Sequence, residues 1–308
     1  MKNAGGVRAF VAFVRLSRLL FLYGGFAGVA FGAAVAVHGG MPFDVATYVW
    51  AQVLVTAFHL MVHYANEYFD AAGDALARRD ARTAWSGGSG ILVDGALPAR
   101  VALVAALFCA AVGLVATARF ALAGNAVVAA LGVAILAFAW FYSAPPLRFA
   151  ARGLGEADAA LVVAVLVPAV GYAAFAHGLD VHMLAATIPT AAAMFAMMLS
   201  VELPDAGADH LAGKRTLVVR WGPSRTWPFL AGAAWTAAVT GLATAFRVAP
   251  PPFVAALVPS VVAAAAIVWL TVRDPRPATL AFWGVALYAT TVTGLAVVFA
   301  LAPSTGSG

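Results

Sequence analysis

Long apolar runs without a charged side chain are the feature that most constrains this fold. The stretch from Val127 to Phe141 contains none, and similar stretches recur along the 308 residues. Hydrophobic residues make up 64% of the chain and charged residues 10%, whereas soluble domains carry about 25% charged residues. So little charge cannot cover a surface that faces water, and the apolar content excludes disorder. The runs also lack the alternation of a membrane barrel. We therefore expect an all-α polytopic membrane bundle.

The number of membrane spans follows from run length, because a span needs about 20 apolar residues. Nine segments qualify, at roughly 17–37, 45–65, 100–120, 124–142, 157–176, 182–201, 227–246, 252–272 and 278–300. With short connections these helices fill the chain, which predicts one transmembrane domain over 1–308 with a flexible tail at 303–308. The first span is too long for a cleaved signal peptide.

Basic residues indicate the orientation of the bundle. With the N-terminus placed inside, every Lys and Arg except Arg119 and Arg247 falls on the cytoplasmic side, as the positive-inside rule requires. This predicts an N-in, C-out protein of the bacterial inner membrane. It also explains the net charge of +5 without a nucleic-acid partner. Two cytoplasmic segments, 66–99 and 202–226, are long, and long loops in compact bundles are usually functional.

Acidic residues gather at the ends of the second and sixth spans. Asn66, Asp70 and Asp74 are spaced i, i+4, i+8, so on a helix they share one face, about 6 Å apart along the axis. Asp205 and Asp209 repeat the i, i+4 spacing. Oxygen-rich acidic faces suit Mg²⁺, which uses one or two carboxylates and bridges to substrate phosphates. The alternative is that these are loop acids paired with nearby arginines.

Basic and glycine-rich segments follow the acidic clusters. Arg78 comes after the first and Lys214 after the second, which fits either phosphate contacts or the positive-inside rule. The glycine-rich segment Ser86–Gly90 offers backbone N–H groups for an anion, or is simply a loop. It lacks the Lys-Ser/Thr ending of a P-loop.

Other polar residues have plainer explanations. His59 and His63, at i and i+4, lack the third ligand of a metal site, so we expect them to line an acceptor chamber or to bond neighbouring helices. Asp158 begins the fifth span, where a helix N-terminus favours an anion. The single Cys109 lies in an apolar run and excludes an intramolecular disulfide; we expect a small buried side chain.

Several of these stretches resemble one protein family. The segment from Asn66 to Asp74 resembles the NxxxDxxxD motif of the UbiA superfamily of intramembrane prenyltransferases. The segment from Asp205 to Asp209, with the following Gly213-Lys-Arg-Thr-Leu217, resembles that family's second DxxxD motif and its trailing segment. Two shorter stretches agree: Tyr142–Arg148 with Gly153–Glu156, and Gly87–Gly95. The chain looks most like the menaquinone branch, which prenylates 1,4-dihydroxy-2-naphthoate.

The resemblance implies a mechanism and a set of site residues. Mg²⁺ bound by the two motifs would hold the diphosphate of a polyprenyl donor and stabilise it as a leaving group. An aromatic acceptor would then attack the allylic carbocation in a cavity kept dry by the lipid bilayer. The expected metal ligands are Asn66, Asp70, Asp74, Asp205 and Asp209. The four aspartates and Tyr142 are the expected catalytic residues, and the expected substrate contacts are Asn66, Arg18, Arg78, Lys214, Arg148 and His63.

The acceptor remains open at this level. Relatives that use naphthoate often carry Asn just before the second motif, where this chain has Ser200, Val201 and Glu202. Glu202 offers an extra carboxylate instead. Other acceptors of the superfamily stay possible: 4-hydroxybenzoate, haem or chlorophyll precursors, and glycerol or sugar phosphates. A secondary transporter with a midplane carboxylate site is the alternative from another class, although the acids here lie at span ends. The sequence gives no oligomeric state.

Overall fold

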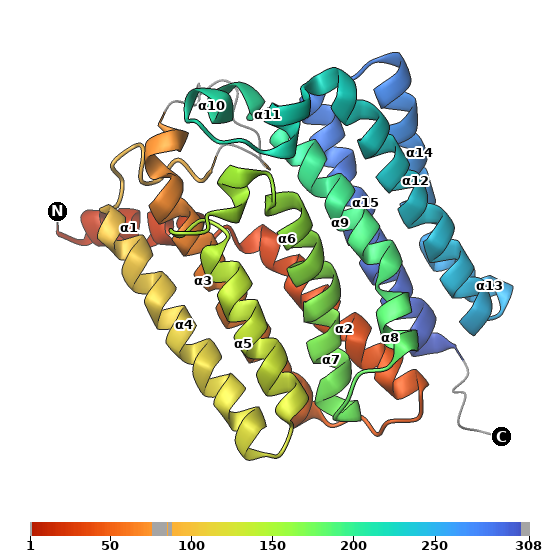
Figure 1. Ribbon diagram of the computed structural model, residues 1–308. Helices are drawn as coiled ribbons and strands as arrows, with labels where there is room; N and C mark the ends of the chain where they lie inside the picture. Colours follow the sequence, from red (N-terminus) through yellow and green to blue (C-terminus); the bar gives the residue numbers. More distant parts are fainter. Residues whose placement is uncertain (1, 76–84, 86–87, 303–308) are drawn as a thin grey trace.

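A computed structural model describes residues 2–75, 85 and 88–302, and within these ranges all regular structure is helical. Figure 1 shows the long helices running side by side, with short helices at one end. The helices, in chain order, are α1 (Lys2–Leu16), α2 (Leu22–His38), α3 (Val45–Asp74), α4 (Ala99–Leu122), α5 (Ala126–Phe141), α6 (Gly155–Leu161), α7 (Val167–Ala176), α8 (Val181–Ala186), α9 (Ile188–Glu202), α10 (Ala206–Leu211), α11 (Leu217–Trp221), α12 (Pro223–Val248), α13 (Pro251–Val254), α14 (Val258–Arg273) and α15 (Pro277–Leu301).

The membrane-spanning character predicted from the sequence is confirmed. In the described part of the chain, 8 helical stretches are long and apolar enough to cross a membrane. The fourth predicted span, 124–142, corresponds to α5, an apolar helix of 16 residues, which is shorter than the usual span of about 20. Large apolar side chains such as Phe108, Trp235 and Trp269 are exposed on the outside of the bundle. A surface that faces lipid explains this exposure, because so many exposed apolar side chains would be unfavourable in water.

The bundle has two cores that meet along α2. One core joins α3, α4, α5 and α7, and the other joins α9, α12, α14 and α15. Helix α2 packs against both α7 and α15. Close approach to α7 depends on glycine, because a Cβ at Gly32 would overlap the backbone carbonyl of Pro168, and one at Gly171 would overlap that of Val29. Small residues at such crossings let membrane helices pack by dispersion.

Helix boundaries differ from the predicted spans at several places, and three of them lie near the predicted polar residues. The first span is expected from residue 17, but the helix breaks at Arg18, whose backbone is left-handed (φ 48°), and α2 begins only at Leu22. Helix α3 continues through Asp74, so the loop expected from residue 66 starts after it. The fifth span contains a π-helical turn, η4 (Val162–Leu166), just before Pro168, which has no N–H to donate. Such turns often mark functional sites.

Short helices close one end of the bundle. Helices α10 and α11 lie there, α10 against α3 and α11 against α9, and α15 ends at the opposite end (Figure 1). Backbone hydrogen bonds join the closing segment to the turn after α5, where the Arg215 N–H donates to the Ala151 carbonyl over 2.9 Å. The predicted tail at 303–308 lies outside the described residues.

Candidate active site

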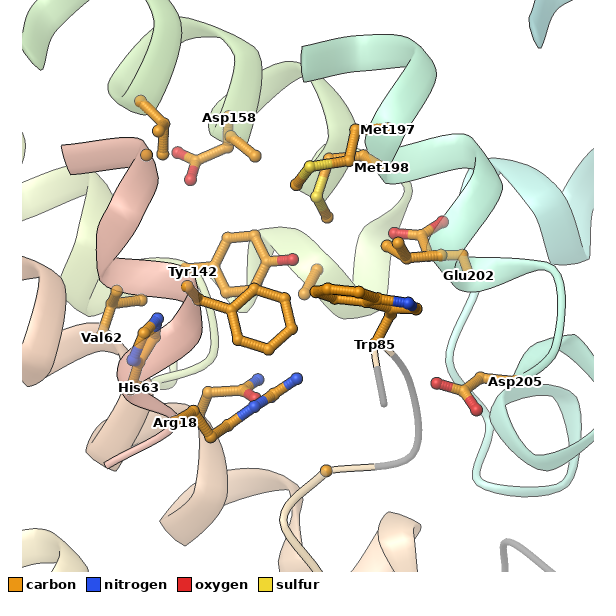
Figure 2. Close-up of a pocket in the computed structure, with 18 of the residues that line it drawn as sticks. Arg18, Val62, His63, Trp85, Tyr142, Asp158, Met197, Met198, Glu202 and Asp205 are labelled. Carbon is orange, nitrogen blue, oxygen red and sulfur yellow. The ribbon is translucent and has the colours of Figure 1, made fainter. Parts of the chain in front are cut away.

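A cavity of about 520 Å³ opens between the two cores, below α10. Nine of the residues expected from the sequence line it. They are Arg18, His63, Asn66, Asp70, Asp74, Tyr142, Asp205, Asp209 and Lys214. They come from the break before α2, from α3, from the end of α5, and from α10 with its flanking turns, so only the tertiary fold brings them together. Figure 2 shows several of these side chains around one space.

The first acidic motif lies on one face of the last three turns of α3. Asn66 donates from Nδ2 to Asp70 Oδ2 (2.9 Å) and to the Ser143 hydroxyl (2.8 Å). Asp70 is 7% exposed, so its carboxylate is held away from bulk water. The predicted i, i+4 arrangement is therefore present, with the amide of Asn66 orienting the first carboxylate.

The second motif approaches the first through a lysine. Lys214 Nζ lies 2.9 Å from Asp70 Oδ2 and 3.4 Å from Asp209 Oδ1. The Lys214 backbone N–H also donates to the Asp209 carbonyl over 2.9 Å, which fixes the turn that follows α10. One ammonium group thus connects carboxylates that are far apart in the sequence.

The electrostatics of this cluster depend on burial. Burial raises the pKa of Asp209, although the Lys214 ammonium acts in the opposite direction. Burial also disfavours the charge on Lys214, but the neighbouring carboxylates of Asp70 and Asp209 outweigh it and raise its pKa above the usual value. Lys214 therefore stays protonated, and it neutralises part of the negative charge that the two motifs concentrate here.

A cation other than lysine suits the same place. Among the described residues, no three His, Cys, Asp or Glu side chains already converge as a metal site. The carboxylates of both motifs nevertheless face one cavity, and an all-oxygen donor set is what Mg²⁺ prefers. The ammonium of Lys214 shows that a cation between Asp70 and Asp209 is electrostatically favourable. The donor chemistry therefore fits Mg²⁺ held between the motifs.

Two further glutamates hold the surrounding segments in place. Glu67 is 3% exposed and accepts from both the N–H and the hydroxyl of Ser89, each at 2.7 Å. This brings Gly88 (φ +64°) so close to Asp74 that a Cβ there would overlap its carboxylate. Glu156, fully buried, accepts from the Leu217 N–H at 2.5 Å and so ties α6 to α11. Both contacts position loops against the acidic motifs.

The two ends of the cavity differ in chemistry. One end is aromatic and basic: the Arg18 guanidinium lies 4.5 Å from the Phe21 ring centre, and Phe21 makes edge contacts with His63 and Trp85. The other end is apolar. It is lined by Val163, Met194, Met197, Met198, Tyr288 and Ala289. Flexible methionines fill irregular apolar spaces well, so this end suits an aliphatic chain.

Tyr142 lies at the end of α5, between these regions (Figure 2). Burial raises the pKa of Tyr142 well above its ordinary value, and nearby carboxylates raise it further. These carboxylates are Glu202, Glu156, Asp158 and Asp70. The phenol therefore stays protonated and acts only as a neutral group or hydrogen-bond donor.

The structure does not bring every expected residue to the cavity. Arg148 is exposed and is not among the residues that line it; its backbone is left-handed (φ 46°) and directly precedes the short 3-10 helix Phe149–Arg152. Arg78 and the first part of the Ser86–Gly90 segment lie outside the described residues.

Sequence reasoning missed several groups at the cavity. Met194, Met197 and Met198 line its apolar end and look in the sequence like ordinary core residues. Asp158 was explained by its place at a helix start, yet it lines the cavity. The signal available for Asp158 was its chemistry, since a carboxylate inside an apolar span is costly and points to function.

Comparison with known proteins identifies the family. The UbiA prenyltransferase family model matches residues 25–291. The chain belongs to the UbiA prenyltransferase family. The family assignment makes it a prenyltransferase, and the apolar helices described above make it an integral membrane enzyme.

Solved structures of this family share the fold. A UbiA homologue from Aeropyrum pernix aligns with TM-score 0.66 and 17% identity, over 88% of this chain and 96% of that one. A homologue from Archaeoglobus fulgidus bound to GPP and Mg²⁺ aligns with TM-score 0.64 and 16% identity, over 93% and 99%. A digeranylgeranylglyceryl phosphate synthase aligns with TM-score 0.61 and 12% identity, over 94% and 97%. The comparison with curated proteins gave no match.

Proposed function

We propose that this UbiA-family enzyme transfers a polyprenyl group from its diphosphate to an aromatic acceptor, with Mg²⁺ as cofactor. The acceptor that we favour is 1,4-dihydroxy-2-naphthoate, which would place the enzyme in menaquinone synthesis. The observation that carries the proposal is the meeting of both acidic motifs and Lys214 in one cavity that is apolar at one end and aromatic at the other. The acidic motifs with Lys214 suit a diphosphate, the apolar end suits an aliphatic tail, and the aromatic end suits an aromatic ring.

The diphosphate end is supported by charge. Mg²⁺, when bound, would neutralise the diphosphate and make it a better leaving group. Asp70, Asp74, Asp205 and Asp209 would hold the metal, with Asn66 orienting Asp70 through its amide. Lys214 would turn from the carboxylates to the phosphate oxygens, since an ammonium binds either. A family member whose structure contains GPP and Mg²⁺ supports this assignment.

The reacting carbon must lie where the polar and apolar parts of the cavity meet, because it joins the diphosphate to the tail. Carbocations react with water, and the buried helices around this point exclude it. The protonated phenol and ring of Tyr142 lie in this region and would face the developing cation, which aromatic rings stabilise. Arg18 and His63, with Phe21 and Trp85 around them, offer the acceptor an aromatic surface with positive charge.

The location of the site follows from the basic residues. Lys214, Arg215 and Arg220 belong to the segment that closes the cavity. By the positive-inside rule this end faces the cytoplasm, where a soluble aromatic acid and a metal ion would enter. We accordingly place the enzyme in the bacterial inner membrane with its site on the cytoplasmic side.

The test is a prenyl-transfer assay on the whole protein in detergent or lipid. Radiolabelled GPP or a longer polyprenyl diphosphate is incubated with Mg²⁺ and with 1,4-dihydroxy-2-naphthoate, 4-hydroxybenzoate or a glycerol phosphate. Asp70→Asn and Asp205→Asn should lower the rate by about 10²–10³-fold, as for the loss of one electrostatic contact in a transition state. Asp274→Asn, an exposed carboxylate outside the cavity, is the matched control.

The outcomes separate the alternatives. Formation of labelled product from 1,4-dihydroxy-2-naphthoate supports the full proposal if this product is lost with EDTA and in both cavity variants. Product on 4-hydroxybenzoate or glycerol phosphate instead corrects the acceptor. No transfer to any acceptor, with no Mg²⁺-dependent binding of the donor, would refute the proposed reaction and favour transport.

A further inference from the structure

Asp158 is a buried carboxylate that the proposed reaction has not yet used. It lies in α6, is 8% exposed, and lines the cavity. Its Oδ1 atom is buried and has no hydrogen-bond partner among the described residues, and Asp158 forms no ion pair with any of them. A lone carboxylate of this kind is costly. The helix start favours its charge but supplies no partner for Oδ1, so a ligand is the natural explanation.

The helix face of Asp158 places it at the junction of the cavity. Asp158 and Val162 are four residues apart on the same side of the fifth span, and both line the cavity. Val162 begins the apolar lining, and the charge of Asp158 acts on Tyr142 after the stronger effects of Glu202 and Glu156. Figure 2 shows Asp158 on the side of Tyr142 that faces Met197 and Met198. We infer that the tail begins here and that the prenyl carbon meets the acceptor beside Tyr142.

We propose that Asp158 is the general base that takes the hydroxyl proton of the aromatic acceptor. This inference rests on the proposed function. In the step, the donor C–O bond breaks and diphosphate leaves with its electron pair. The acceptor O–H bond breaks, and its electrons feed the ring, which forms the new C–C bond to the prenyl carbon. The proton moves to the Asp158 carboxylate. The attacked ring carbon still carries its hydrogen, which moves to the ring oxygen and restores the aromatic ring, so charge and atoms balance without a further reagent.

Other groups in the cavity fit this role less well. Asp70 and Asp209 are engaged with Lys214, and the motif carboxylates are needed for metal. Glu202 also has a buried oxygen without a described partner, but it lies beside Glu156 and three residues before Asp205, at the diphosphate end. His63 is bound through Nδ1 to the Ser17 carbonyl at 3.1 Å. Among the described carboxylates away from the diphosphate end, Asp158 combines an unpartnered oxygen with a place in the cavity lining.

The experiment compares acceptors that differ in hydroxyl acidity. Wild type, Asp158→Asn and Asp158→Glu are assayed with Mg²⁺, a polyprenyl diphosphate and the active acceptor. They are also assayed with a ring-nitrated derivative whose hydroxyl is already ionised at the assay pH. Asp158→Asn should react about 10²–10⁴-fold more slowly than wild type with the ordinary acceptor, which is the usual contribution of general base catalysis. On the ionised derivative Asp158→Asn should match wild type. Asp158→Glu should recover part of the lost rate on the ordinary acceptor and should also match wild type on the ionised derivative.

Matched variants separate this role from a structural one. Glu202→Gln changes another cavity carboxylate that has a buried, unpartnered oxygen. It should lose a similar factor on both acceptors because Glu202 takes no acceptor proton. Thermal stability and donor binding of Asp158→Asn should stay near wild type. Formate added to Asp158→Ala should restore part of the rate.

The role assigned to Asp158 can be refuted without refuting the proposed function. A wild-type rate for Asp158→Asn, or an equal loss on both acceptors, would overturn the assignment of the base while leaving the prenyltransferase intact. No product from wild type on any aromatic acceptor would instead overturn the proposed function.

Discussion

Removal of the Lys214 ammonium tests the central electrostatic feature of the site. Lys214, Asp70 and Asp209 are 13%, 7% and 14% exposed, so Lys214→Met would leave two buried carboxylates without their cation. Breaking a buried pair by deleting one partner costs about 3–5 kcal/mol. The partial exposure of the group favours the lower end, about 3 kcal/mol. At roughly 2–4 °C per kcal/mol for chains of this order of size, the melting temperature should fall by about 6–12 °C.

The assay is thermal unfolding in detergent, followed by tryptophan fluorescence, with EDTA and then with Mg²⁺. Mg²⁺ stabilises whichever folded state binds it. In Lys214→Met it meets no competing ammonium between the carboxylates, so it should raise the melting temperature more than in wild type. Lys214→Arg keeps the charge and should lose less. Arg276→Met, which removes an exposed partner of Asp274, is the control and should change nothing measurable.

Two results would refute this reasoning. If Lys214→Met has the same melting temperature as wild type in EDTA, the ammonium does not compensate the charge of the carboxylates. If Mg²⁺ stabilises both proteins equally, metal and lysine do not share the same place.

The remaining predictions concern backbone approach and capping. Gly88→Ala should weaken donor binding, measured as a raised KM, because its Cβ would displace the Asp74 carboxylate; it should also lower the melting temperature, because a residue with a Cβ is strained at φ +64°, and an unchanged KM would contradict this. Asn125→Ala should lower the free energy of unfolding by about 2–4 kcal/mol, since it removes the cap of α5 and a 2.8 Å bond to the buried Ala173 carbonyl; Asn125→Ser, which keeps only a capping oxygen, should lose less. Gly32→Ala should prevent the close packing of α2 on α7, seen as a large drop in melting temperature; a normal melt would show that the helices can separate at no cost.

Comparison of the prediction with the structure shows where sequence reasoning ends. The helical membrane fold and the face shared by Asn66, Asp70 and Asp74 were predicted correctly, because helix periodicity is local. The exact start of the first helix was not, since a left-handed residue such as Arg18 gives no compositional signal. The exposure of Arg148 could not be predicted either, because it depends on how one turn leaves α5.

The sequence by itself determined that the chain is a bundle of membrane helices carrying two acidic motifs. Run length decides whether a segment can span a bilayer, and residue spacing decides which side chains share a helix face. Only the tertiary structure decided which groups meet across the cavity. Lys214 reaches Asp70 across 144 positions of sequence, and Asp158 enters the cavity because α6 packs against α9. Such contacts depend on helix packing, which is the sum of many small interactions distributed over the whole chain, and no single segment encodes it.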